Sequence, residues 1–278
     1  MDSDISSLSK TASLRARYGD DAIPAAGPWN ATLDLLLAHR SVRSYLANPL
    51  PEGTLETLVA AAQSAATSSN LQTWSVVAVT DVEAKRQLAA VAGNQRHIME
   101  CPLFLVWLAD LSRNQRLGDA AGVTLEAIPY LETFFVAGVD AALAAQNAVI
   151  AAESLGLSTV YIGALRNDPA RVAEILGLPS GSAGVFGLCV GYAKPESGAA
   201  VKPRLPQAVV LHRERYNARD EARLIADYDA TMTVFSARNE TARTTWSERV
   251  FGRMAKVASM AGRDRLRTVL NNLGFELR

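Results

Sequence analysis

The sequence contains little of several features that define whole classes of protein. Its 278 residues include only two cysteines and three histidines, and 28 Lys and Arg balance 28 Asp and Glu. A formal net charge of zero gives no overall attraction for nucleic acid or for an anionic membrane. Cys101 and Cys189 both lie in apolar runs, which favours reduced, buried thiols over a disulfide scaffold or a reactive thiol. We therefore expect neither a nucleic-acid partner nor a membrane partner.

Signals for secretion and for membrane insertion are also lacking. The first 20 residues are polar and mixed in charge, without the apolar core of a secretory signal. The longest apolar stretch, about residues 134–157, is interrupted by Asp140, Gln146, Asn147 and Glu153. A buried helix of a soluble protein is therefore expected there, in preference to a membrane span. The prediction is a cytoplasmic protein.

Familiar motifs of catalysis and nucleotide binding are absent. The chain has no G-x-G-x-x-G after a strand, no G-x-x-x-x-G-K-[ST], no H-E-x-x-H, no paired C-x-x-C and no G-x-S-x-G. A nucleotide cofactor would therefore not bind through a Rossmann or Walker loop. His39, His97 and His212 lie far apart in the sequence, so neither a metal site nor a Ser-His-Asp triad is indicated.

Hydrophobic periodicity and turn signals predict helices and strands in mixed order, typical of an α+β domain. Helices are expected over about 32–40, 54–66, 137–156 and 169–176, and strands over 75–80, 102–110, 158–165, 184–193 and a segment after Pro206, AVVLHRE. Residues 112–130 are expected to form a helix and a loop. Residues 1–30 are interpreted as an extension that wraps or frays, and 31–278 as a single domain. Its last part, about 213–278, is expected to be a helical arm, with 13 Lys and Arg against nine Asp and Glu.

Four polar clusters stand out within this apolar sequence. The first is His39, Arg40, Ser41 and Arg43, just after a predicted helix. Two guanidiniums and a hydroxyl could bind a phosphate, although an arginine-rich helix end also pairs with the helix macrodipole. The second, residues 66–74, offers small hydroxyl and amide groups that could surround a flat heterocycle or could serve turn formation alone.

The third cluster lies at the end of a predicted strand, and the fourth lies in a segment that contains two prolines. In the segment 161–167, Gly163 and Ala164 lack bulk where a strand enters a loop, so a ring could approach the backbone closely. In KPRLP, Lys202 and Arg204 lie on one side of a proline-stiffened extended segment. Two cations at that spacing could hold one phosphate or carboxylate together.

Taken together, the order and content of these clusters resemble the nitroreductase family of flavoproteins, most closely its NADPH-dependent, oxygen-insensitive nitroreductases and NADPH:flavin oxidoreductases. The resemblance runs from about Thr32 to the C-terminus. It rests on HRSVR, ATSSNLQ, AGNQRH, AAQNAVIAAESLGL, VYIGALRN, FGLCVGY, KPRLP and TTWS. It implies a nitroreductase-like, FMN-dependent α+β fold with a mainly antiparallel central sheet flanked by helices, in an intertwined homodimer.

The resemblance also implies which residues bind the cofactor and the electron donor. FMN contacts are carried over to His39, Arg40, Ser41, Arg43, Ser68 or Ser69, Gln95, Tyr161, Ile162, Gly163, Ala164, Lys202 and Arg204. Arg238 and Arg243 resemble positions that recognise the 2′-phosphate of NADPH. ATSSNLQ is about two residues shorter than the serine-rich form of the NADPH group, which leaves the choice between the two serines open. The first 28 residues have no counterpart in the family.

The implied activity is two-electron transfer from NADPH to nitroaromatics and quinones by a ping-pong mechanism. The chemistry would take place at flavin N5, with no catalytic side chain. One alternative is an NADPH:FMN oxidoreductase that supplies reduced flavin. Another, from a different class, is a flavin-binding protein without reductase turnover, in which the unmatched N-terminal extension covers the acceptor site.

Overall fold

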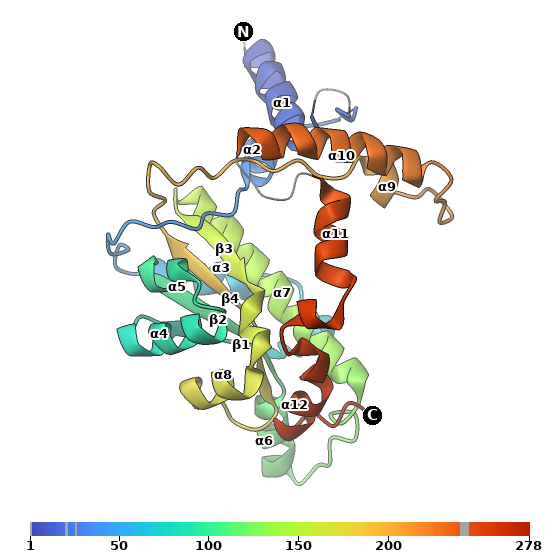
Figure 1. Ribbon diagram of the computed structural model, residues 1–278. Coiled ribbons are helices and arrows are strands. Elements are labelled where there is room, and N and C mark those ends of the chain that lie inside the picture. Colours follow the sequence, from blue (N-terminus) through green and yellow to red (C-terminus); the bar gives the residue numbers. More distant parts are fainter. Residues whose placement is uncertain (1, 20–21, 26, 240–244) are drawn as a thin grey trace. The chain divides into compact units, whose positions relative to one another are not determined.

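The computed structural model describes residues 2–19, 22–25, 27–239 and 245–278. The chain forms two compact units (Figure 1). One consists of Met1–Arg40 and Gly198–Ser259, and we call it the helical unit; the other consists of Ser41–Ser197 and Met260–Arg278, and we call it the sheet unit. Each unit is described by itself below.

The sheet unit is built on four strands in the order β1-β2-β4-β3, and each neighbouring pair is antiparallel. The strands are β1 (Trp74–Val79), β2 (Leu103–Asp110), β3 (Ser158–Ile162) and β4 (Ser182–Gly191). All eight residues of the central strand β2 are buried, because helices cover both faces of the sheet. The predicted antiparallel α+β architecture is confirmed, and each of these strands lies within two residues of its expected start.

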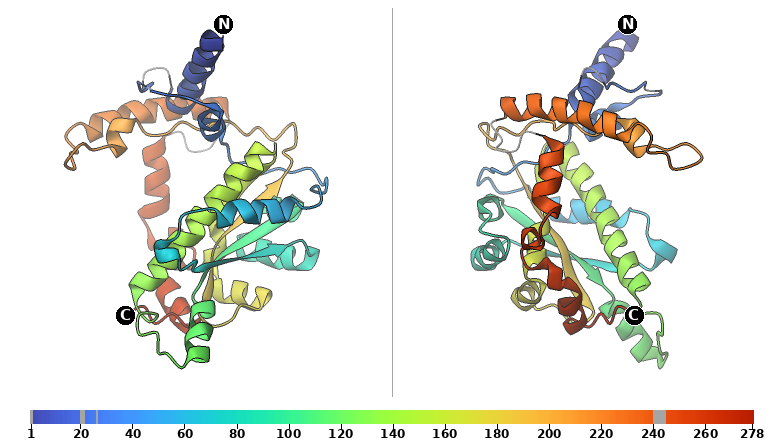
Figure 2. Two further views of the ribbon diagram at one scale, coloured as in Figure 1. Left: turned by 180° about the vertical axis from the view of Figure 1, so that it is seen from behind. Right: turned by 45° about the vertical axis from the view of Figure 1, so that its right-hand side comes forward.

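Two helices, α3 (Thr54–Gln63) and α7 (Leu131–Ser154), cover one face of the sheet. Helices α4 (Val82–Val91), α5 (Arg96–Glu100) and α8 (Pro169–Leu176) lie on the other face (Figures 1 and 2). The buried face of α7 is made almost entirely of alanine: Ala137, Ala141, Ala144, Ala145, Ala148 and Ala152. The last four of these side chains pack with Leu105, Trp107 and Leu188 of the sheet in one hydrophobic core, and Ala137 belongs to a second cluster.

The C-terminal segment closes the far end of the sheet unit. It contains the 3₁₀ helix η4 (Arg263–Arg265) and α12 (Leu266–Asn272). Its last residue pairs with the start of α7: Arg278 N donates to Pro129 O at 3.0 Å, and Leu131 N donates to Arg278 O at 3.2 Å. The rings of Phe134 and Phe275 meet edge to face at 5.0 Å. Helix α6 (Ser112–Ala121), after β2, completes the predicted helix and loop.

The helical unit contains α1 (Asp2–Tyr18), α2 (Ala31–Ala38), α9 (Gln207–Val210), α10 (Glu221–Arg238) and α11 (Trp246–Met254). Helix α11 begins at a capping box in which Thr245 and Glu248 each accept a hydrogen bond from the other's backbone N–H at 3.1 Å. The carboxylate of Asp229 in α10 accepts from the Trp246 and Ser247 amides at 2.8 and 3.0 Å, which ties α11 to α10.

One local prediction is wrong, and one helix was not predicted. No helix was expected in the N-terminal extension, where residues 2–18 form α1. The segment AVVLHRE was expected to be a strand, but its first residues lie in α9 and no strand follows within the described part of the chain. Its β-branched pair, Val209 and Val210, has no neighbouring strand among the described residues, and strand preference depends on such pairing.

The cysteine prediction is confirmed: Cys101 and Cys189 are fully buried and form no disulfide. Among the described residues, α7 is the one helix that is long and apolar enough to cross a membrane. The same length and composition are found in core helices of soluble proteins, and the alanine face of α7 packs on the sheet.

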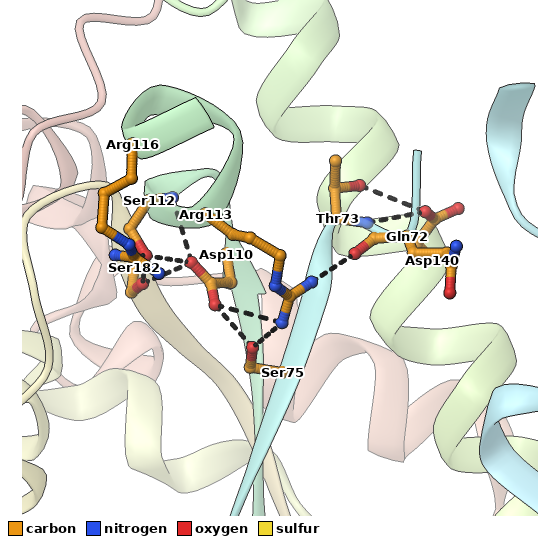
Figure 3. Close-up of polar contacts among 9 residues, drawn as sticks. All are labelled: Gln72, Thr73, Ser75, Asp110, Ser112, Arg113, Arg116, Asp140 and Ser182. Atoms are coloured by element: carbon orange, nitrogen blue, oxygen red, sulfur yellow. Dashed lines mark hydrogen bonds and ion pairs between the residues drawn. The ribbon is translucent and has the colours of Figure 1, made fainter. Parts of the chain in front are cut away.

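One end of the sheet carries a buried carboxylate, Asp110, which is 6% exposed (Figure 3). Its oxygens accept hydrogen bonds from the hydroxyls of Ser75 (2.5 Å), Ser112 (2.5 Å) and Ser182 (2.8 Å) and from the Ser112 amide (3.0 Å). Burial acts to raise the pKa of Asp110, but these hydrogen bonds outweigh it and hold the pKa below its ordinary value. The ionised carboxylate thus joins β1, β2 and β4 to the start of α6.

The stabilising effect of Asp110 should depend on pH. Because its folded pKa is lowered, the contribution is complete above the unfolded value of about 4 and is lost as pH falls through the folded pKa. Asp110→Asn should lower the free energy of unfolding by about 2 kcal/mol at neutral pH, since hydrogen bonds to a charged group are lost. The difference from wild type should shrink as pH falls below about 4 and through the lowered folded pKa.

Urea denaturation of both proteins from neutral to acidic pH measures this difference. Asp119→Asn, in the exposed part of the same helix α6, is the matched control and should have little effect at any pH. A difference between wild type and Asp110→Asn that stays constant with pH would contradict the assignment.

Candidate functional site

The first predicted cluster directly follows α2. The side chain of Asn30 caps this helix by accepting from Leu33 N at 3.1 Å, and the helix ends at Ala38. Ser41 then forms a parallel bridge with Thr159 of β3, and Val42 N donates to Thr159 O at 3.0 Å. This pairing buries Val42 and leaves the neighbouring Arg43 exposed.

The arginines of this cluster are available for a ligand. Arg40 and Arg43 make no hydrogen bond or ion pair with any other residue in the described part of the chain. The four residues of this cluster are divided between the two units: His39 and Arg40 belong to the helical unit, and Ser41 and Arg43 belong to the sheet unit. Two guanidiniums without internal partners are suited to binding an anion.

A buried histidine from a second segment lies near Arg43. His97 is 8% exposed, and its Nε2 has no hydrogen-bond partner among the described residues. Burial lowers the pKa of His97, and the charge of Arg43 lowers it further. The predicted contact Gln95 lies two residues earlier, before α5, where its Nε2 donates to Ala92 O at 3.0 Å. A buried ring nitrogen without a partner beside a cation marks this place as one where a ligand could supply the missing hydrogen bond.

The serine-containing cluster forms a tight loop between α3 and β1. It includes the 3₁₀ helix η1 (Ser68–Asn70), and three of its non-glycine residues adopt left-handed backbone angles: Ser69, Asn70 and Gln72, with φ of 48°, 55° and 51°. Such conformations cost energy and persist where the surroundings enforce them. The hydroxyls of Ser68 and Ser69 are exposed and have no hydrogen-bond partner within the described chain, so either of them could contact a ligand.

Asp140 of α7 enforces this loop (Figure 3). This carboxylate, 2% exposed, accepts from Thr67 Oγ1 (2.5 Å), Ser68 N (3.1 Å), Thr73 N (3.2 Å) and Thr73 Oγ1 (3.1 Å). The sequence had indicated Asp140 only as an interruption of an apolar stretch. An acid in the middle of a buried helix is a signal of such a role, because burial requires partners.

The third cluster lies where β3 enters the 3₁₀ helix η2 (Gly163–Asn167). Tyr161 is 37% exposed, and its ring packs edge to face on Phe186 at 5.1 Å. Ile162 is buried, and at Gly163 a Cβ atom would lie 3.2 Å from Nη2 of Arg166. The small residue therefore makes room for the guanidinium of Arg166, which donates to Val185 O.

The fourth cluster is an extended segment of the helical unit. Arg204 is exposed and donates through Nη1 to Lys202 O at 3.1 Å, while Lys202 is half-buried. The hydroxyl of Tyr228 in α10 donates to Pro203 O at 2.8 Å. This segment forms no regular structure of its own, and the side chain of Tyr228 from another element holds its backbone.

The residues predicted for NADPH are only partly described. Arg238 is exposed at the end of α10 and lines a cavity of about 610 Å³ with Arg15, Val201, Val234 and Phe235. Arg243 lies outside the described residues. The described part of the chain holds no group of three or more His, Cys, Asp or Glu side chains that could bind a metal ion.

The structure therefore brings together some predicted residues within each unit. In the helical unit, the guanidinium of Arg17 donates hydrogen bonds to the backbone carbonyls of both His39 and Lys202. In the sheet unit, Ser41 pairs with the strand that carries Tyr161, and Arg43 lies near the segment of Gln95. Sequence reasoning missed Arg17, Asp140 and His97.

Comparison with known proteins identifies the family. Residues 36–192 match the model of the nitroreductase family, and residues 202–278 match the model of the nitroreductase family C-terminal domain. The chain belongs to the nitroreductase family, as its motifs had indicated, and the fold is the nitroreductase fold.

Individual relatives agree with this assignment. An FMN reductase (NADPH) of Bacillus subtilis is 40% identical over 230 residues, which cover 81% of this chain and 92% of the relative. An oxygen-insensitive NADPH nitroreductase of Salmonella typhimurium is 37% identical over 221 residues, covering 79% and 89%. The solved structure of the hypothetical oxidoreductase YcnD from Bacillus subtilis superimposes with a TM-score of 0.84 at 35% identity, covering 90% of this chain and 100% of that one.

The loop around Ser68 should depend on the buried carboxylate that holds it. Asp140→Ala leaves four donors without their acceptor, so the free energy of unfolding should fall by about 3 kcal/mol. Glu132→Ala, an exposed acid in the first turn of the same helix, should cost under about 1 kcal/mol. Chemical denaturation measures both, and equal losses would show that Asp140 does not hold the loop.

Proposed function

We propose that the protein is an FMN-dependent oxidoreductase that transfers two electrons from NADPH to nitroaromatic and quinone acceptors in a ping-pong sequence. The observation that carries the proposal is the exposed Arg43 of HRSVR, which has no hydrogen-bond or ion-pair partner in the described part of the chain and lies near the partnerless Nε2 of the buried His97. Relatives named FMN reductase (NADPH) and oxygen-insensitive NADPH nitroreductase support the cofactor, the donor and the class of reaction.

The residues fit FMN by their chemistry. Arg43 would hold the ribityl chain and the phosphate, with His39, Arg40 and Ser41 as further contacts, and Lys202 and Arg204 would supply the cations at the phosphate and at the pyrimidine edge. Ser68 or Ser69 and Gln95 would supply hydroxyl and amide contacts. The backbone of Ile162, Gly163 and Ala164, next to the partly exposed ring of Tyr161, would lie near the N5 edge of the isoalloxazine. Bound FMN would supply hydride acceptance and donation at N5, chemistry that no side chain provides.

The chain's own residues would act by binding and orientation. A stacking surface beside Tyr161 holds donor and acceptor in turn, which raises the rate by positioning. A cation near the pyrimidine edge, such as Lys202, stabilises negative charge that develops there. This division of labour needs no acid, base or nucleophile, so the proposal assigns no catalytic side chain.

Free flavin is a second candidate acceptor. The relative named FMN reductase (NADPH) is slightly more similar to this chain, at 40% identity, than the nitroreductase at 37%. An enzyme of that kind would release reduced flavin instead of a reduced nitro compound. Steady-state kinetics with free FMN and with a nitroaromatic, at equal NADPH, distinguish the two acceptors by kcat/KM.

We also propose that two copies form a cytoplasmic homodimer. Supporting this, α7 exposes large apolar side chains on the face opposite its alanine row: Phe135 is 64% exposed, Val139 41% and Leu143 43%. They recur every four residues, so they form one apolar stripe on the helix. A second copy of the chain is the occupant that the family resemblance implies for such a surface.

The proposed activity is tested on the purified protein. It should be yellow and dimeric, NADPH should bleach the flavin absorbance under anaerobic conditions, and menadione or a nitroaromatic should restore it. Reoxidation would exclude a flavin-binding protein without turnover. A colourless protein that cannot be reconstituted with FMN would refute the proposal. Arg43→Ala and Lys202→Ala should each lose FMN on gel filtration, and normal retention by both would refute the phosphate assignment.

Arg238 should determine the preference for NADPH. Its cavity combines two guanidiniums with the ring of Phe235, and its volume lies in the usual range of ligand sites, so it suits an adenosine phosphate. Arg238→Ala should raise KM for NADPH about tenfold, because a charge-assisted contact is lost, and leave KM for NADH nearly unchanged. Arg219→Ala, an exposed arginine just before α10 that does not line this cavity, is the control. Equal effects on both donors would contradict this role.

A further inference from the structure

The N-terminal helix α1 carries a buried arginine that the family's motifs do not include. Arg17 lies in the last turn of α1 and is 6% exposed, although arginine is rarely buried without partners. The match to the nitroreductase model begins only at residue 36, so α1 lies outside the family's shared sequence. Its role is therefore not explained by the family resemblance.

The guanidinium of Arg17 bonds to the backbone of two separate segments. Nη1 donates to Lys202 O at 2.8 Å, and Nη2 donates to Leu37 O at 2.5 Å and to His39 O at 2.8 Å. The backbone carbonyl of Arg17 also accepts from Arg204 N at 2.9 Å. One residue thus holds the end of α2, where HRSVR starts, and the KPRLP segment.

These two segments need such support because they lie beyond the end of α2 and in an extended loop. Residues 39–40 and 198–205 belong to no helix or strand, so their carbonyls lack the partners that regular structure provides. Arginine suits this task, since its planar fork offers five donors in a fixed geometry. Lysine concentrates its donors on a single nitrogen and could not span the same carbonyls.

Helix α1 is itself attached to the unit by further contacts. Leu14 is buried, and Ser13 Oγ donates to Asp34 Oδ1 of α2 at 2.9 Å. Trp29 Nε1 donates to the same oxygen at 2.9 Å. These contacts hold the backbone of Arg17 in place. Its guanidinium therefore has a defined position relative to the two segments.

We propose that Arg17 is a positioning residue for the cofactor: within the helical unit it sets the spacing between Arg40 of HRSVR and the cations of KPRLP, and so preorganises these groups for the phosphate of FMN. This inference rests on the proposed function, because it takes FMN as the ligand of those cations. The N-terminal extension is then a built-in part of the cofactor site. Without Arg17, FMN binding would have to order both segments itself, at a cost in affinity.

The test compares Arg17→Gln and Arg17→Lys with wild type in the full-length protein. Arg253→Gln is the matched control, because Arg253 also donates to a backbone carbonyl of the helical unit, that of Ser259, away from both segments. Hydrogen exchange of the FMN-free proteins measures the order of residues 36–40 and 198–206. Quenching of FMN fluorescence measures the dissociation constant.

We expect faster exchange in both segments of Arg17→Gln, including the Arg204 amide, and an FMN dissociation constant about 10- to 100-fold higher. Arg17→Lys should lie between wild type and Arg17→Gln, and Arg253→Gln should match wild type in both measurements. A rise in the dissociation constant while the Tm of the FMN-free protein stays close to that of the control would separate positioning from general stability.

Other outcomes would overturn the inference. Unchanged exchange in either segment would show that Arg17 does not order it, whatever the affinity for FMN. Faster exchange with unchanged FMN affinity would show that α1 has a structural role alone. A wild-type protein that binds no FMN would refute the proposed function and, with it, the cofactor role of Arg17. That result needs no variant, so it is distinguishable from a failure of the Arg17 inference alone.

Discussion

The close approach of α7 to the sheet is the constraint on which the sheet unit depends. Alanine at most of the buried positions of α7 lets the helix backbone lie near Leu105, Trp107 and Leu188, and larger side chains there would push it away. The same approach brings the carboxylate of Asp140 within hydrogen-bond distance of the loop before β1. One helix therefore stabilises the core and also fixes the serine loop of the candidate site.

The sequence predicted the sheet unit well because its signals are local and mutually consistent. Buried strands such as β2 are short apolar runs bounded by turn residues, and α8 begins at Asp168-Pro169 and ends before Gly177 as its capping signals indicate. Prediction was incomplete or wrong where structure depends on distant partners. Helix α1 was not predicted, since it has weak periodicity and is held by Arg17 and Leu14, and AVVLHRE has strand-like residues but no strand beside it in the described part of the chain.

The candidate site was predictable to the extent that its residues cluster in sequence. HRSVR, VYIGALRN and KPRLP each carry several relevant groups within a few positions, so pattern and family resemblance find them. Arg17 and Asp140 could not be found in that way, since the three hydrogen bonds of the Arg17 guanidinium and two of the four of Asp140 are to backbone atoms, and a carbonyl or amide has no signature in a sequence. His97 was visible in AGNQRH, but its burial was not.

Two of the missed groups, Asp140 and Arg17, share a physical logic that links the fold to the proposed chemistry. Irregular backbone loses entropy when it is ordered, so a loop that presents binding groups needs support from other elements. Each unit supplies one buried charge for this purpose: Asp140 accepts four hydrogen bonds around Thr67 and Thr73 in the sheet unit, and Arg17 donates three around Lys202 and His39 in the helical unit. A neutral side chain could satisfy fewer of these groups, and each bond would be weaker. Because burying either charge is favourable only when all of its partners are in place, each loop has one geometry and not several. The zero net charge of the chain therefore says little about local structure, since single buried charges at particular places hold these loops.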